Sequence, residues 1–297
     1  MSPDSRAAKK KWRKRHPFLF WGGIFLLVLA AGHAAHWAAR GPLAGPRIAV
    51  VNIEGLILDA AAVTDWLETV CRDSSVRAVV VRVNSPGGGV APSQELYRAV
   101  KRAAEIKPVV VSMGAVAASG GYYAALGGRE IFANPSTLTA GIGVKLRLPN
   151  LEGLLRAAGI AEKTLSTGSL KDAGSFSRSP SPEEEAYFQD LIRDMFEEFL
   201  SAVIRERKLP PEQARALADG RAMTGRQALK AGLVDRIGDF RDALARAGEL
   251  GRFPPGALPD LVTGPEKSFS LVREIFGVLL EISADRGIAA GQPVFLY

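Results

Sequence analysis

The stretch VRAVVVRVNSPGGGV, residues 76–90, places a nearly continuous run of β-branched residues directly before a glycine-rich turn. A run of valines without polar alternation is typical of a strand that is buried on both faces of a parallel sheet. Pro86 and the three glycines at 87–89 then favour a sharp turn from that strand into the next element. The stretch therefore predicts one strand-turn-helix unit of an α/β fold.

The same alternation continues on both sides of this stretch, which predicts a βαβ series around a buried parallel sheet. From residue 251 the chain becomes rich in proline and glycine, and we assign no role to its apolar stretch Phe269–Ile282. The expected elements are a strand at 47–58, a helix near 62–72, the strand at 76–83, a helix near 92–106, a strand at 108–113, a strand near 129–133, a second glycine-rich turn at 136–144, a long amphipathic helix from Ser181 to Lys208 and a compact helical unit from Gly220 to Phe240.

A single hydroxyl, Ser119, lies among small residues in GAVAASGGYYAALGG, residues 114–128. It is placed where a strand should turn into a helix, and small neighbours would let the backbone of a bound peptide approach the hydroxyl. Ser119 is therefore a candidate nucleophile. The alternative is that the glycines and alanines only allow close packing between a helix and a strand.

The histidines are restricted to the N-terminal part, at positions 16, 33 and 36. A Ser-His-Asp triad, a Cys-His pair and a histidine-ligated zinc are thus excluded from the rest of the chain. The single cysteine, Cys71, excludes an internal disulfide. The GxxxxGK[ST] and GxGxxG phosphate motifs are missing, and we expect no metal and no cofactor.

The N-terminal region combines a basic segment with an apolar one. The formal net charge is +7, but residues 1–16 alone carry +6, so we do not expect nucleic-acid binding by the remainder. Residues 18–39 contain no charged side chain and would span roughly 33 Å as a helix. We expect a transmembrane anchor there, with residues 1–17 cytoplasmic and the rest extracytoplasmic. A cleavable signal peptide ending near Gly32-His33-Ala34 is the alternative.

Without histidine, the natural base for Ser119 is a neutral lysine, which burial in an apolar pocket favours by lowering the lysine pKa. The candidates are Lys145, Lys163 and Lys171. Lys171 lies in STGSLKDAGS, a loop of small residues that would pack over a site, whereas Lys163 has the surroundings of a solvated side chain. The local sequence does not decide among the three. The SPGGG turn, for its part, is a candidate source of backbone N–H donors for an oxyanion.

Five motifs in order, SPGGG, AASGGYYAA, TAGIGV, GSLKDAGS and ADGRAMTGRQALKAGLVDRIG, resemble the signal peptide peptidase A family (SppA) in its short single-repeat form. The resemblance implies an α/β fold with a ClpP/crotonase-type repeated ββα core behind the N-terminal transmembrane helix. It implies a serine-lysine dyad of Ser119 and Lys171, and oxyanion donors at Gly87 or Gly88 with Gly120. One departure concerns Gly141, which stands where the family has a serine that holds the lysine amine, so Thr139, Ser166 or a water would have to replace it.

The resemblance also implies cleavage of signal-peptide remnants by a membrane-bound homo-oligomer whose catalytic domain is extracytoplasmic. The domains expected are the basic segment at 1–17, the anchor at 18–39, the peptidase domain at 47–250 and a C-terminal extension at 251–297. Two alternatives share the fold: a crotonase-type enzyme acting on acyl-CoA, and a catalytically silent membrane scaffold. An extracytoplasmic location and the lack of a basic cluster near the glycine turns weigh against the acyl-CoA enzyme.

Overall fold

The computed structural model describes residues 17–40, 45–256, 259–265 and 295–296, and the chain divides into two compact units, residues 1–46 and 47–297. In the first unit, α2 (Pro17–Arg40) is one continuous helix of 24 residues. Within the described part of the chain, no helix is both long enough and apolar enough to cross a membrane. The anchor expected at 18–39 therefore stays a prediction.

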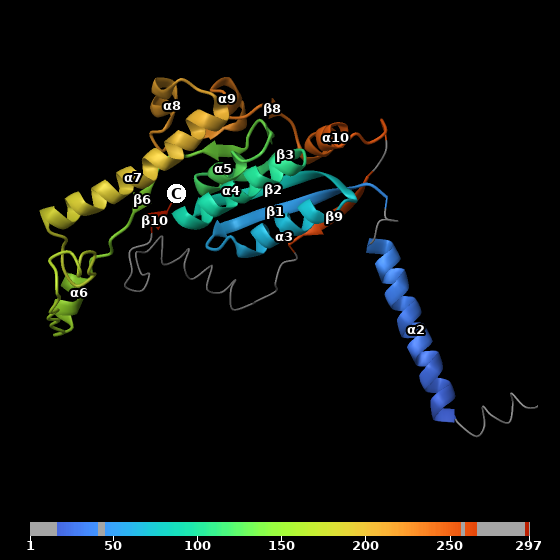
Figure 1. Ribbon diagram of the computed structural model, residues 1–297. Coiled ribbons are helices and arrows are strands. Elements are labelled where there is room, and N and C mark those ends of the chain that lie inside the picture. Colours follow the sequence, from blue (N-terminus) through green and yellow to red (C-terminus); the bar gives the residue numbers. More distant parts are fainter. Residues whose placement is uncertain (1–16, 41–44, 257–258, 266–294, 297) are drawn as a thin grey trace, which may run out of the picture. The chain divides into compact units, whose positions relative to one another are not determined.

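An eight-stranded sheet forms the centre of the second unit, in the order β7-β5-β3-β2-β1-β9, and a side branch runs from β3 through β4 to β8 (Figure 1). All pairings in it are parallel except that of β5 with β7. A separate antiparallel pair joins β6 to β10. The strands are β1 (Arg47–Ile57), β2 (Val76–Gly88), β3 (Val109–Ala118), β4 (Glu130–Ala133), β5 (Leu138–Ala140), β6 (Lys145–Leu146), β7 (Ala222–Thr224), β8 (Arg236–Ile237), β9 (Asp260–Gly264) and β10 (Phe295–Leu296).

Both faces of the central strands are buried, which explains their uninterrupted β-branched sequences. Val79 and Val81 of β2 belong to the main core, whereas Ala78 and Val80, pointing to the other face, belong to a second core beneath α10. The helices of the second unit are α3 (Ala61–Arg72), α4 (Val90–Ile106), α5 (Gly120–Ala125), α6 (Glu152–Ala157), α7 (Pro182–Arg207), α8 (Pro211–Leu217), α9 (Gly225–Lys230) and α10 (Phe240–Leu250).

The long helix begins as its sequence indicates. Ser181 accepts a hydrogen bond from the Glu184 amide, the Glu184 carboxylate accepts one from the Ser181 amide, and Pro182 occupies the first turn. The second half of α7 is buried through Phe199, Leu200 and Val203. Tyr123 of α5 stacks on Phe199 with ring centroids 4.7 Å apart, so α7 covers the helix that follows Ser119.

One expectation needs correction. The segment Gly220–Phe240 is not only helical, because β7 and β8 flank α9 within it. Their sequences are too short to show a strand period, and only pairing with β5 and β4 defines them. The C-terminal extension also contributes to the sheet, since β9 pairs in parallel with β1 from Arg47↔Asp260 to Val51↔Gly264. The apolar stretch Phe269–Ile282 lies outside the described residues.

Candidate active site

Ser119 lies at the junction of β3 and α5 in a conformation that side chains rarely adopt, with φ +56° and ψ −121°. The surrounding backbone fixes this turn: the Ser119 amide donates to the Ala140 carbonyl at 2.7 Å, and the Tyr123 amide donates to the Ser119 carbonyl at 2.9 Å. Within the described residues, the Ser119 hydroxyl caps no amide of α5. A strained strand-to-helix turn that presents a half-buried, uncapped hydroxyl is a typical position for a nucleophile.

The glycines after Ser119 pack against the SPGGG turn of the same chain. A Cβ on Gly120 would lie 2.2 Å from Ser93 Oγ and 3.3 Å from the Gly87 Cα, and one on Gly121 would lie 2.7 Å from the Ser85 carbonyl oxygen. These positions therefore need glycine for internal close packing. The alternative of close packing therefore applies to Gly120 and Gly121, and the approach of a peptide to the Ser119 hydroxyl stays a prediction.

Of the three oxyanion candidates, the structure brings Gly87 and Gly120 together, but Gly88 faces elsewhere. Gly87 has φ +101°, and its amide donates to Ser85 Oγ at 3.1 Å. Gly120 is the first residue of α5, where backbone amides have no acceptor inside the helix. Gly88 pairs with Ile57 of β1, and a Cβ on it would lie 2.1 Å from the Ile57 carbonyl oxygen. A glycine is thus required at position 88 by the close approach of β1 to β2.

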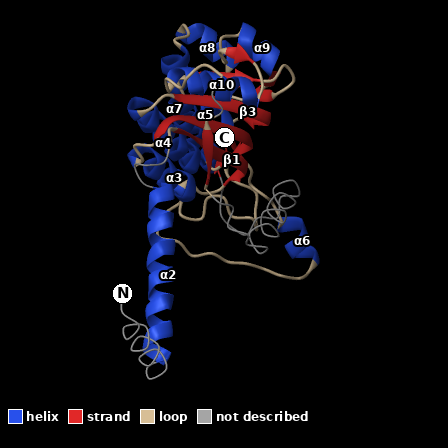
Figure 2. Cartoon of the chain, turned by 90° about the vertical axis from the view of Figure 1, so that its right-hand side faces the viewer, coloured by secondary structure: helices blue, strands red, loops and turns tan. Residues whose placement is uncertain are grey.

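Among the described residues, no hydrogen bond or ion pair joins Lys171 to Ser119. Its side chain is exposed, and it lies in a turn whose amide donates to the Gly168 carbonyl at 3.2 Å. Figures 1 and 2 agree in showing α6, which precedes this turn, well away from α5. Lys145 and Lys163 are also exposed. The structure of a single chain therefore does not distinguish among the three lysines by proximity.

The loop that carries Lys171 is held to the start of α7 by Arg178. The Arg178 guanidinium donates to the Asp172 carboxylate at 3.0 Å and to both Glu184 oxygens at 2.6 and 2.8 Å. Glu184 is buried, and the hydrogen bonds from Arg178, ahead of those from Ser181, lower its pKa from 4.5 to about 2. This network was not predicted from the sequence. Its only sequence signal is an arginine six residues from each acid, a common spacing.

Gly141 also lies beside Ser119. It follows Ala140, both residues have φ +62°, and a Cβ on Gly141 would lie 3.4 Å from the Ser119 amide nitrogen. The two hydroxyls named as substitutes for the missing family serine both donate to backbone carbonyls. Thr139 Oγ1 is buried and donates to the Ala117 carbonyl at 2.7 Å, and the exposed Ser166 Oγ donates to the Gly168 carbonyl at 2.9 Å. Neither hydroxyl holds the Lys171 amine in this chain.

Comparison with known proteins finds peptidases. The sequence profile described as Peptidase family S49 matches residues 101–252. A Synechocystis sp. protein named "Putative protease slr0021" is 39% identical over 269 residues, which cover 84% of this chain and 96% of that protein. The Arabidopsis thaliana protein "Serine protease SPPA, chloroplastic" is 31% identical over 304 residues, covering 97% of this chain and 43% of its own length. An Enterococcus faecium protein, "Putative signal peptide peptidase SppA", is 37% identical over 179 residues, covering 60% and 52%.

Proposed function

The chain belongs to peptidase family S49, and on that premise we propose that it is a serine endopeptidase with Ser119 as its nucleophile and Lys171 as its general base. The observation that carries the proposal is the backbone at Ser119. It is strained, with φ +56°, and the next residue, Gly120, packs against Gly87. Such a turn holds a hydroxyl next to backbone amides, which is what acyl transfer to serine requires.

The proposed reaction is acyl transfer in two steps. The neutral Lys171 amine takes the proton from Ser119 Oγ, which attacks a peptide carbonyl and forms a tetrahedral intermediate. The lysine then protonates the leaving amine, the C–N bond breaks and the acyl-enzyme results. In the second step the neutral lysine takes a proton from water, which attacks the ester, and Ser119 leaves with that proton while the acyl group is released as a carboxylic acid. The Gly120 amide is available to the oxyanion, whereas the Gly87 amide must first leave Ser85 Oγ, its present acceptor.

We propose further that Lys171 acts on Ser119 of a neighbouring copy in a homo-oligomer. Lys171 is exposed and lies on a loop fixed to the N-terminal end of α7, while the second half of α7 covers α5. This arrangement supports a base that is presented outward and completes a site in trans. Oligomers whose contacts run head to tail repeat one such site between every pair of neighbours.

Substrate and location follow the family resemblance. We propose that the enzyme cleaves signal-peptide remnants and similar apolar peptides, bound in extended form along a strand edge, and that residues 18–39 anchor it with the catalytic unit extracytoplasmic. Protease added to intact spheroplasts should then digest the chain after Arg40. Protection there, with digestion only after lysis, would overturn the orientation.

The dyad is tested by labelling and by complementation. A fluorophosphonate probe should label the wild type and fail to label Ser119→Ala, and absence of labelling of the wild type would favour the silent scaffold. Lys171→Arg should be nearly inactive, because a guanidinium group does not deprotonate in the pH range of the assay, whereas Lys145→Ala and Lys163→Ala should keep most activity.

A mixture of two variants tests whether the dyad forms between neighbouring chains. Ser119→Ala and Lys171→Ala chains, mixed equally and co-assembled at random, should recover about a quarter of wild-type turnover. No recovery from a mixed oligomer would place both residues in one chain.

A further inference from the structure

A strongly basic surface lies between α4 and the C-terminal end of α7, outside the candidate active site. Its residues line an open hollow of about 550 Å³ together with Tyr97 and one carboxylate, Glu206. The basic side chains, which we call the α4–α7 basic surface, are Arg98, Lys101, Arg102, Arg205 and Lys208. Five positive charges around one hollow attract an anion unless nearby acids neutralise them.

Among the described residues that line the hollow, the one carboxylate is already engaged. Glu206 accepts hydrogen bonds from Lys101 Nζ at 2.5 Å, Tyr97 Oη at 2.6 Å and Arg205 Nε at 3.2 Å. In the described part of the chain, Arg98, Arg102 and Lys208 form no ion pair. Glu105 lies one turn beyond Arg102 on α4 and pairs with neither arginine. The hollow therefore keeps three basic side chains that form no ion pair among the described residues.

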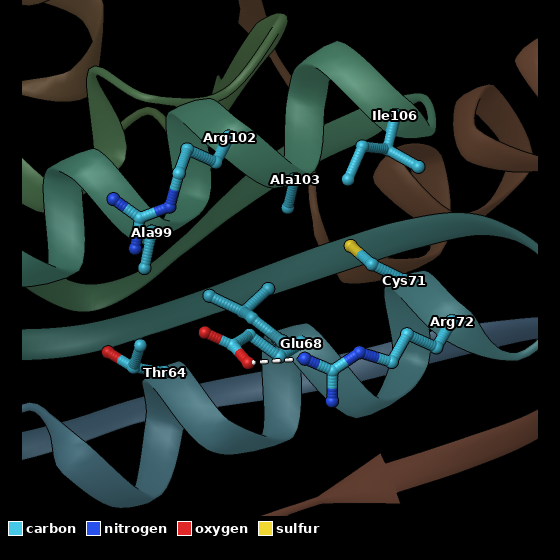
Figure 3. Close-up of a pocket in the computed structure, with 9 residues that line it drawn as sticks. Thr64, Glu68, Cys71, Arg72, Ala99, Arg102, Ala103 and Ile106 are labelled. Carbon is cyan, nitrogen blue, oxygen red and sulfur yellow. Dashed lines mark hydrogen bonds and ion pairs between the residues drawn. The ribbon is translucent and has the colours of Figure 1, made fainter.

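An apolar groove of about 210 Å³ adjoins this surface between α3 and α4, and Arg102 lines both (Figure 3). Leu67, Ala99 and Ala103 form its apolar part, and the Ile106 side chain at its end is 64% exposed. Figure 3 shows the Arg102 side chain along α4 and the Glu68–Arg72 ion pair on the α3 side. A cluster of arginine and lysine beside exposed aliphatic surface fits the boundary between lipid headgroups and acyl chains.

We infer that the α4–α7 basic surface docks on anionic phospholipid headgroups, with Ile106 at the acyl boundary, and so orients the peptidase unit on the membrane. The inference rests on the proposed membrane location. Three basic side chains without an ion pair in the described chain, together with the exposed aliphatic side chain of Ile106 next to them, argue for a lipid surface over a free polyanion, which would need the charges alone. Each basic residue near an anionic membrane strengthens association roughly fivefold.

The test uses the full chain on two kinds of vesicle, phosphatidylcholine alone and phosphatidylcholine with phosphatidylglycerol. Co-sedimentation with neutral vesicles measures membrane binding by the proposed anchor in α2. A chain that fails to co-sediment would contradict the proposed anchor, but it would not contradict lipid binding by the α4–α7 basic surface. On vesicle-bound chain, the acetylation rate of Lys208 by an N-hydroxysuccinimide ester should fall several-fold when the vesicles are anionic. The protection should disappear at high salt, because exposed charges are then screened. The exposed Lys230 of α9 should react equally on both vesicles.

A matched pair of variants separates this surface from charge in general. Arg98→Gln/Arg102→Gln should weaken the anionic-lipid effect about twenty-five-fold, whereas Arg226→Gln/Arg241→Gln, equally exposed and without an ion pair in the described chain, should leave it unchanged. If the chain does not bind neutral vesicles, the same comparison is made by co-sedimentation with anionic ones. Equal acetylation of Lys208 on both vesicles, an equal effect of the two variants, or full protection by soluble glycerol phosphate would each overturn the inference.

Discussion

Replacing Gly88 by alanine tests whether this glycine serves the sheet or the oxyanion. The added Cβ would lie 2.1 Å from the Ile57 carbonyl oxygen and 2.6 Å from the Ile57 nitrogen, both backbone atoms of β1. No side-chain rotation relieves this contact, so β1 and β2 must separate there. The hydrogen bond from the Gly89 amide to the Ile57 carbonyl, 2.8 Å long, would be lost as well. Gly88→Ala should therefore act mainly on stability.

The expected cost is about 3 kcal/mol of unfolding free energy, from overpacking plus one broken buried hydrogen bond. For a chain of this size that lowers Tm by about 6 to 12 °C. Two controls calibrate the measurement. Gly141→Ala has no contact closer than 3.4 Å and should lose only about 1 kcal/mol, from its positive φ. Gly248→Ala, inside α10 with open space around it, should be neutral or slightly stabilising.

The assay is thermal unfolding followed by far-ultraviolet circular dichroism, with peptide turnover measured on the same samples below the transition. We expect Gly88→Ala to melt well below both controls and to lose activity in step with its folded fraction. A Gly88→Ala protein that melts within 2 °C of wild type yet turns over peptide a hundredfold more slowly would refute the packing argument, because that loss is typical of a missing oxyanion donor.

Three further predictions concern the supports of the site. Arg178→Gln removes the hydrogen bonds to the Asp172 and Glu184 carboxylates and so releases the loop that carries Lys171. It should lower kcat about tenfold or more with KM nearly unchanged, because a misplaced base slows the chemical step more than it weakens substrate binding. Arg193→Gln, which removes only an exposed ion pair on α7, is the control. Because the folded-state pKa of Glu184 is depressed from 4.5 to about 2, its stabilising contribution is present above pH 4.5 and lost as the pH falls toward 2; Glu184→Gln should flatten that part of the Tm profile, and an unchanged slope would contradict the assignment. Tyr122 is fully buried and donates to the Leu233 carbonyl at 2.9 Å, so Tyr122→Phe should cost about 1 to 2 kcal/mol in urea unfolding.

The parts of the fold that the sequence predicted are those with a local cause. Runs such as RIAVV and VRAVVVRV have a strand signal in each window, and Ser181-Pro182-Glu183-Glu184 contains a complete helix start. The two glycine-rich turns, which contain Gly87 and Gly120, were also predicted from residue type alone. The contacts that could not be predicted from the sequence join distant segments of the chain. Nothing near Gly88 in the sequence reveals Ile57, and nothing near Arg178 reveals that two acids share its guanidinium. The same limit hid β9, because its five residues become a strand only beside β1.

The pairing of β9 with β1 has a consequence for synthesis. Arg47 and Asp260 are partners, so one edge of β1 stays open until a segment 213 residues later has left the ribosome. At 5 to 20 residues per second that interval is roughly 10 to 40 s. During it the nascent chain presents an unpaired, apolar strand edge, RIAVV, which is the kind of template on which other chains add. A chain that stops before residue 260 would present that edge permanently, and a holdase chaperone would have to cover it.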